Sequence, residues 1–322
     1  MLAYHNNRSW KNVRMVLSPP STLSNDAIRE ALGLYPSLVE KVYRSKLKDP
    51  KKISDAIERD RWRYEGLTGA IALLKSETKH EDDVGSSSAD VAEGALTKKA
   101  LERLVQWKIT HGHSRPFLPA MVRKNDPASV QTQTKLAWAK LSTSEEGKEP
   151  PTSTVSAALD LVCKLTGIGP ATGTLILNVY EPVHIPFFQD EMFMWFFPAT
   201  KSEKLKYTQK EYVQLLGAVG PVLKKLGIKA VELEKVSYVL AHLDVLEPSQ
   251  RNALEAALKS PDQASGSEAT EQKKGQEDDG SSDRKPGNQL GTKKESKRDA
   301  SEADIADNKQ EQPPKRRSRR NK

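Results

Sequence analysis

The sequence predicts an all-α protein followed by a disordered C-terminal tail, and three observations support this. Between residues 21 and 258, apolar residues recur with a period near 3.6, the spacing of amphipathic helices. No segment alternates clearly between apolar and polar residues, and the short run at 183–188 is the one candidate strand. From residue 259 to residue 322, aromatic residues are absent and large aliphatic residues nearly so. Such a segment cannot bury enough apolar surface to offset a chain entropy of about 1–2 kcal/mol per residue.

The composition limits the class of protein further. The 322 residues carry a formal charge of +8, and residues 259–322 hold 16 basic and 13 acidic side chains, so residues 1–258 also have a basic excess. This balance favours nucleic acid as a partner, although solubility alone also accounts for such a charge. The single cysteine, Cys163, excludes an intramolecular disulfide framework and a cysteine-ligated cluster. We expect no cofactor, no metal site and no membrane span.

The elements are predicted in order along the chain. A polar N-terminal arm at 1–20 ends in two prolines and precedes the folded domain at 21–258. Two breaks, 79–94 and 142–154, are predicted to be surface loops. Gly220 and Pro221 predict a kink in one helix, or its division into two. The predicted helices are 24–35, 37–46, 54–76, 97–112, 133–142, 154–166, 170–180, 190–197, 208–227 and 229–243.

The tail ends in a cluster of cations, "KRRSRR" at 315–320, with "KKESKR" at 293–298 upstream. Basic runs of this kind are typical of nuclear-import signals or of loose phosphate-binding arms. A solvated basic end without function is the alternative. We therefore expect the protein in the nucleus, with an import receptor as a partner of this run.

The segment "ALDLVCKLTGIGPATGTLIL" at 158–177 predicts a helix, a tight hairpin and a second helix, within a motif at 155–181. Ile168 is expected to point into the core between the helices. Gly167 and Gly169 allow backbone conformations that a Cβ forbids, and Pro170 suits the first position of the second helix. The hairpin then presents free backbone N–H groups at a helix N-terminus, which is a phosphate-binding site independent of base sequence.

These residues resemble the helix-hairpin-helix DNA glycosylase superfamily. Its hairpin reads L-P-G-(I/V)-G-x-x-T-A and is followed, about twenty residues later, by a catalytic aspartate. Here the run begins at Leu165, and Asp190 lies 21 residues after Gly169. The run "GIGPAT" followed by "PFFQDE" looks most like the Amun-like branch of glycosylase-like proteins. The resemblance implies catalysis by Asp190 and DNA-backbone binding by Gly167, Ile168, Gly169, Pro170, Ala171 and Thr172.

One departure from the family pattern concerns the chemistry. The bifunctional members hold a nucleophilic lysine at the position of Ala171, so the resemblance implies a hydrolytic, monofunctional enzyme without lyase activity. A buried carboxylate at Asp190 would stabilise the positive charge that develops on the sugar as the N-glycosidic bond breaks. The alternative role of Asp190 is a helix N-cap that accepts from the amides of Met192 or Phe193.

Other chemistry-bearing residues receive structural roles. Glu191 is expected to be a first-turn acid that interacts with the helix dipole rather than a second catalyst. His111, His113 and Arg115 are expected at a surface turn, where Arg115 contacts phosphate or solvent. A flipped base needs stacking faces, yet the tryptophans are expected mainly in the core: Trp10, Trp62, Trp107, Trp138 and Trp195.

The sequence thus predicts a nuclear, monofunctional DNA glycosylase that removes a damaged or mispaired base during DNA repair. A catalytically silent helix-hairpin-helix protein that binds DNA or chromatin is the alternative. A protein-interaction scaffold without nucleic acid would be favoured if the hairpin amides were buried. The first two are discriminated by whether Asp190 opens into a pocket large enough for a nucleobase, within reach of the hairpin.

Overall fold

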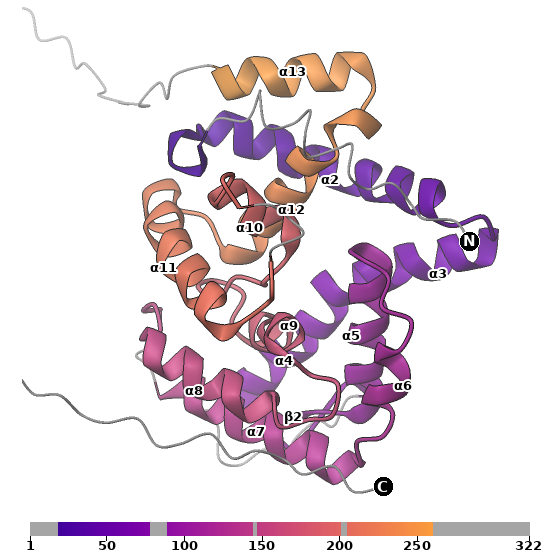
Figure 1. The fold of residues 1–322 in the computed structure, drawn as a ribbon, viewed down its shortest axis with the longest axis vertical. Coiled ribbons are helices and arrows are strands. Elements are labelled where there is room, and N and C mark those ends of the chain that lie inside the picture. The colour runs from indigo at the N-terminus through magenta and orange to yellow at the C-terminus, as the bar shows by residue number, and fades with distance from the viewer. Residues whose placement is uncertain (1–18, 78–88, 144–146, 201–204, 260–322) are drawn as a thin grey trace, which may run out of the picture. The chain divides into compact units, whose positions relative to one another are not determined.

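A computed structural model describes residues 19–77, 89–143, 147–200 and 205–259. These residues form an all-α body with one minor sheet (Figure 1). They all belong to one compact unit, residues 1–265, whereas a second unit, 266–322, contains no described residue. Most of the predicted arm at 1–20, almost all of the predicted tail and its basic run lie outside the described residues.

The helices account for most of the described chain, as the sequence predicts. Short segments are a 3-10 turn η1 (Pro20–Thr22), a π-helical turn η2 (Trp62–Gly66) and a 3-10 turn η4 (Leu243–Val245). The strands β1 (Val91–Ala92) and β2 (Ala95–Leu96) pair antiparallel. The α-helices are α2 (Asn25–Lys46), α3 (Pro50–Arg61), α4 (Leu67–Glu77), α5 (Lys98–His111), α6 (Leu118–Val122), α7 (Pro127–Ser142), α8 (Thr152–Val162), α9 (Pro170–Tyr180), α10 (Asp190–Phe196), α11 (Gln209–Leu226), α12 (Ala230–Ala241) and α13 (Pro248–Lys259).

Prolines divide the helices less than the sequence predicts. The two helices expected on either side of Pro36 form the single helix α2, which begins with the Ser24 side chain accepting from an amide of its first turn. Pro221 lies inside α11, which is one helix and not two. The buried apolar face of each helix offsets the hydrogen bond that a proline removes.

Strand β1 lies where the sequence predicts a loop, at 79–94. Val91 is buried in β1, and β2 begins just after the end of the predicted loop. Strands of two residues are too short for an alternating pattern to be recognised. The candidate strand at 183–188 has no strand assignment and is an irregular segment with buried Phe187 and Phe188.

Close packing fixes the helix pair that carries the hairpin. A Cβ on Gly173 would lie 2.5 Å from Leu159 Cδ1, so this glycine lets α9 approach α8. Asn125 holds the turn between the two helices, because its Oδ1 accepts from the Thr166 amide at 2.7 Å and its Nδ2 donates to the Thr166 carbonyl at 2.9 Å. The position of the hairpin is therefore set by residues distant in the sequence.

A buried polar network supports the segment before α10. Arg63 is fully buried, and its Nη2 donates to Glu234 at 2.9 Å and to Asn178 at 2.5 Å. Gln189 Nε2 donates to the carbonyl of Glu234 at 3.0 Å and to Ser237 Oγ at 2.6 Å. The network joins η2, α9 and α12 to the residue that precedes Asp190.

Candidate active site

The hairpin has the backbone conformation that the sequence predicts at one of its two glycines. Gly167 has φ +82°, in the left-handed region, whereas Gly169, the exposed N-cap of α9, has φ −101°, which any residue can adopt. Ile168 is buried in the core. Among the described residues, no hydrogen bond uses the amides of Gly167, Gly169 or Ala171. Buried hairpin amides would favour a scaffold, but Gly169 is exposed, so the hairpin amides are not all buried.

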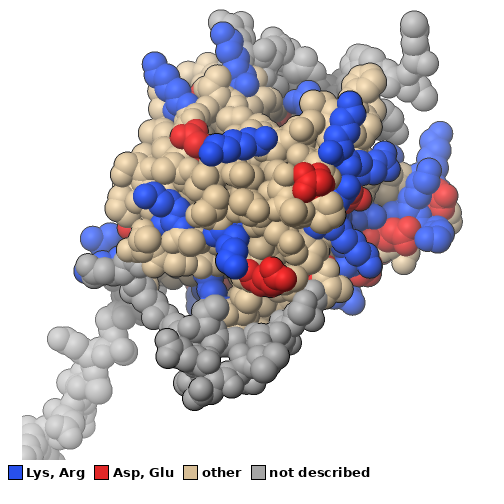
Figure 2. All heavy atoms as spheres, turned by 90° about the horizontal axis from the view of Figure 1, so that it is seen from below, with Lys and Arg blue, Asp and Glu red and all other residues tan. Residues whose placement is uncertain are grey.

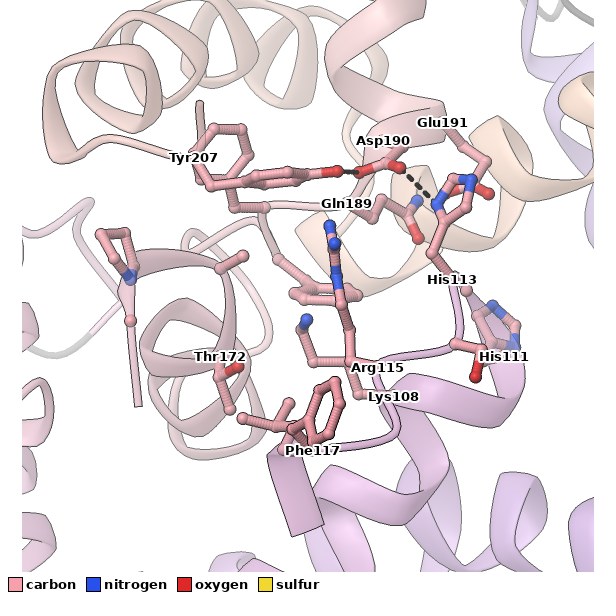
Figure 3. A pocket seen from close by; sticks show the side chains of 18 of the residues that line it. Lys108, His111, His113, Arg115, Phe117, Thr172, Gln189, Asp190, Glu191 and Tyr207 are labelled. Carbon is pink, nitrogen blue, oxygen red and sulfur yellow. Dashed lines mark hydrogen bonds and ion pairs between the residues drawn. The ribbon is translucent and has the colours of Figure 1, made fainter. Parts of the chain in front are cut away.

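A cavity of about 740 Å³, here called the Asp190 cavity, lies between the hairpin, the start of α10 and the loop after α5 (Figure 3). Gly169, Pro170, Ala171 and Thr172 line it on the hairpin side, whereas Gly167 packs against α6 and Ile168 points into the core. Asp190 lines it opposite the hairpin (Figure 3). Its volume is in the usual range for small-molecule sites, about 300–1,000 Å³.

Asp190 does not cap its helix. The N-cap of α10 is Gln189, without a side-chain capping bond, and Asp190 is the first helical residue. Its Oδ1 accepts from the Tyr207 hydroxyl at 2.7 Å, and its Oδ2 lies 2.6 Å from His113 Nδ1 (Figure 3). The side chain of Asp190 is 18% exposed. The residue is thus a half-buried carboxylate held by two side chains from other segments.

The surroundings of Asp190 favour its charged form. Burial alone would raise the pKa of Asp190, but the hydrogen bonds from His113 and Tyr207 and the Lys108 charge outweigh burial, so its pKa is lowered from the ordinary value. The same hydrogen bond raises the pKa of His113. Asp190 is therefore ionised at neutral pH beside the cavity.

Glu191 also lines the cavity, which its predicted role as a simple first-turn acid does not include. Burial and the neighbouring charge of Asp190 raise the pKa of Glu191 to about 7. Two adjacent carboxyl groups thus have pKa values displaced in opposite directions. Such separation is typical of sites that use acid and base chemistry.

Sequence reasoning missed two further side chains at the site. Tyr207 has φ +55°, a conformation uncommon for a bulky residue, and its hydroxyl donates to Asp190. Lys108 reaches into the cavity beside Arg115 (Figure 3), and its ammonium has no hydrogen bond to any described residue. Burial lowers the pKa of Lys108, and the Arg115 charge lowers it further. Neither residue belongs to a local motif, so no sequence signal pointed to it.

The expectation for the 111–115 turn is partly wrong. His111 is buried, with its ring stacked on Trp107 at 4.6 Å and on Tyr238 at 3.9 Å between centroids. His113 and Arg115 do lie in the loop and line the cavity. The described tryptophans are buried in the core, as expected, and the aromatic walls of the cavity are Phe187, Phe188, Tyr207 and the 81% exposed Phe117.

The comparisons with known proteins add no further assignment. A scan against protein-family models, a search of curated proteins and a search of solved structures each gave no match to this chain. Among the described residues, no three His, Cys, Asp or Glu side chains are grouped as a metal site requires. None of the described helices combines the length and apolar character needed to cross a bilayer.

Proposed function

We propose that this protein is a DNA glycosylase that hydrolyses the N-glycosidic bond of a damaged or mispaired base. The observation that carries the proposal is the Asp190 cavity, in which a half-buried, ionised carboxylate faces the free N-terminus of the hairpin helix. The cavity is large enough for a base that has left the helical stack, and Phe187 and Phe188 offer it apolar walls.

Asp190 has one main role in the proposed reaction. Water attacks the sugar carbon C1′, the bond from C1′ to the base breaks, and its electrons leave with the base, which gains the proton that water loses. Positive charge develops on the sugar in the transition state, and the Asp190 carboxylate stabilises that charge. Ala171 provides no amine at the hairpin, so the proposal assigns the attack to water.

DNA is the partner that the hairpin supports, through the amides of Gly169 and Ala171 and through Arg115 at the cavity. Figure 2 shows one face of the protein, on which Lys and Arg side chains lie among acidic ones. Residence in the nucleus and binding of an import receptor through residues 315–320 belong to the same proposal.

A catalytically silent DNA- or chromatin-binding protein is the second candidate. The observation that favours it is that both oxygens of Asp190 already have partners, Tyr207 and His113. A carboxylate held in this way could stabilise the fold without acting on a substrate.

A panel of duplexes, each with one damaged or mispaired base, tests the proposal. We expect one or more of them to be cut at the modified position after heating in alkali, but not before, because hydrolysis leaves an intact abasic strand. Product strands are measured on denaturing gels. Retained DNA binding without base release on every duplex would favour the silent binder instead.

Borohydride trapping on an abasic duplex tests the absence of lyase chemistry, and we expect no covalent adduct at Ala171 or elsewhere in the cavity. Lys108→Met is the matched control, because Lys108 is an amine that lines the cavity. An adduct that wild type forms and Lys108→Met does not would assign a Schiff base to Lys108 and contradict hydrolysis as the whole reaction.

Gly169→Leu tests the hairpin. A Cβ at Gly169 meets nothing within 4 Å, so the variant should fold, while its side chain blocks the free amides. We expect DNA affinity to fall about tenfold for all sequences, the loss of one hydrogen bond to a charged group, about 1.5 kcal/mol. Fluorescence anisotropy at two salt concentrations measures it.

The control is Gly217→Leu, which adds the same side chain on the exposed face of α11. Gly167 is a poor test site, since its φ of +82° and a Cβ placed 2.9 Å from Met121 Cβ would strain the fold. Equal affinity of Gly169→Leu and Gly217→Leu would show that the hairpin amides do not bind the phosphates.

A further inference from the structure

We infer that protonation of His113 controls the net charge of the His113–Asp190 pair, and we call this control the gate. The cavity then prefers a cationic sugar to a neutral one only when His113 is neutral. The inference deepens the proposed function and rests on it, because it concerns the same carboxylate. It adds a positioning residue, His113, that no hairpin or aspartate motif contains.

The geometry places the two groups in direct contact. His113 Nδ1 lies 2.6 Å from Asp190 Oδ2, while the other carboxylate oxygen accepts from Tyr207 (Figure 3). The His113 side chain is 48% exposed, so it can exchange protons with solvent. It lies in the loop between α5 and α6, at the wall of the cavity.

The loop has an anchor that does not depend on His113. Lys46 Nζ, from α2, donates to the carbonyl of His111 at 2.7 Å and to that of Gly112 at 3.5 Å. The backbone just before His113 is therefore held in both protonation states. A neutral imidazole can still donate from Nδ1 to Asp190, so loss of the proton changes the charge more than the position.

The direction of the pH effect on cation binding follows from the ionisation of His113 and Asp190. The hydrogen bond to Asp190 raises the pKa of His113 and contributes to lowering that of Asp190. Between the two pKa values the pair is an ion pair with no net charge, and it offers a developing cation little stabilisation. Above the raised pKa of His113, the pair carries one negative charge. Selectivity for a cation should therefore rise with pH.

Other charged groups face the pair, and their effects on cation binding must be distinguished from the effect of His113. Glu191 from α10 favours the charged form of His113, and Lys46 from α2 disfavours it. Lys108 from α5 faces Asp190, as does the Tyr207 hydroxyl, whose pKa burial raises further above its ordinary value of 10. Glu191 has a pKa of about 7, so it is the main competing origin of a pH effect near neutrality.

The experiment uses the full chain and two probes that require no knowledge of the damaged base. One duplex carries a pyrrolidine in place of a sugar, which is cationic, and the other carries a neutral tetrahydrofuran. The ratio of their affinities is measured by anisotropy between about pH 5.5 and pH 8.5. We expect the preference of wild type for the pyrrolidine duplex to rise about tenfold with pH.

Two variants assign the change. In His113→Gln, which keeps a donor to Asp190 without a titrating charge, we expect a strong preference whose rise with pH is much smaller than in wild type. In Glu191→Gln we expect the pH-dependent rise to persist. A rise that persists in His113→Gln and vanishes in Glu191→Gln would overturn the gate. An NMR titration should also place the pKa of His113 above its ordinary 6.5 in wild type and closer to it in Asp190→Asn.

The outcomes also separate the gate from the proposed function. A preference for the pyrrolidine duplex that does not change with pH in wild type would overturn the gate and leave Asp190 as a cation-stabilising group. Equal affinity for both duplexes at every pH, in wild type and His113→Gln alike, would contradict the proposed function and the gate with it.

Discussion

Replacing Asp190 with asparagine is expected to slow base release by about 10²-fold or more while DNA affinity stays equal or becomes tighter. Asparagine keeps the size of the side chain, and its carbonyl can still accept from the Tyr207 hydroxyl, but it lacks the charge that stabilises a sugar cation. The measurement is a single-turnover rate on the best duplex of the panel.

The structure removes one alternative explanation of a slower rate, because Asp190 is not the N-cap of α10. A change in helix capping therefore cannot account for a loss of rate. Tyr207→Phe is the matched control: it removes one hydrogen bond to the carboxylate and keeps the charge, so its loss of rate should be clearly smaller. Base release at the wild-type rate in Asp190→Asn would remove Asp190 from the reaction.

Replacing Arg63 with methionine is expected to lower the free energy of unfolding by about 3–5 kcal/mol. The change leaves the fully buried Glu234 carboxylate without its cation. It also removes the guanidinium from the ring faces of Tyr64, 4.0 Å away, and Trp107, 4.8 Å away. Urea unfolding followed by circular dichroism measures the difference.

The double variant Arg63→Met, Glu234→Met is the control. With both charges gone, no buried charge is left unpaired, and stability should recover in large part, because an apolar pair can replace a buried ion pair at little cost. Two guanidinium nitrogens of Arg63 have no hydrogen-bond partner among the described residues, which favours this recovery. A single Arg63→Met variant as stable as wild type would show that the ion pair adds nothing.

The helices could be predicted well because their signals are local. The 3.6-residue period identifies α5, α9 and α12 close to their observed bounds, helped by the capping Thr97 of α5 and by Pro170 at the start of α9. The bounds failed where packing overrode a local signal. Pro36 remains inside one helix, and the π-helical turn η2 interrupts a segment that reads as one helix.

The residues of the site also divide into those that a local sequence pattern predicts and those that it does not. The hairpin and Asp190 lie within one short stretch, 165–190, so their spacing could be recognised from the sequence. His113 and Tyr207 come from irregular segments on either side of it, and Lys108 comes from α5. No periodicity or motif in the sequence indicates that these segments converge on the Asp190 carboxylate.

The sequence by itself determined the all-α fold, the glycine hairpin and the position of an aspartate behind it, because each depends on backbone conformation or spacing over a few residues. Only the tertiary structure decided what Asp190 contacts, because Tyr207 is brought to it by the packing of α11 on α10, and His113 by the anchored loop after α5. The charge of a half-buried carboxylate depends on those neighbours, through desolvation and hydrogen bonding, and not on the residues beside it in the chain.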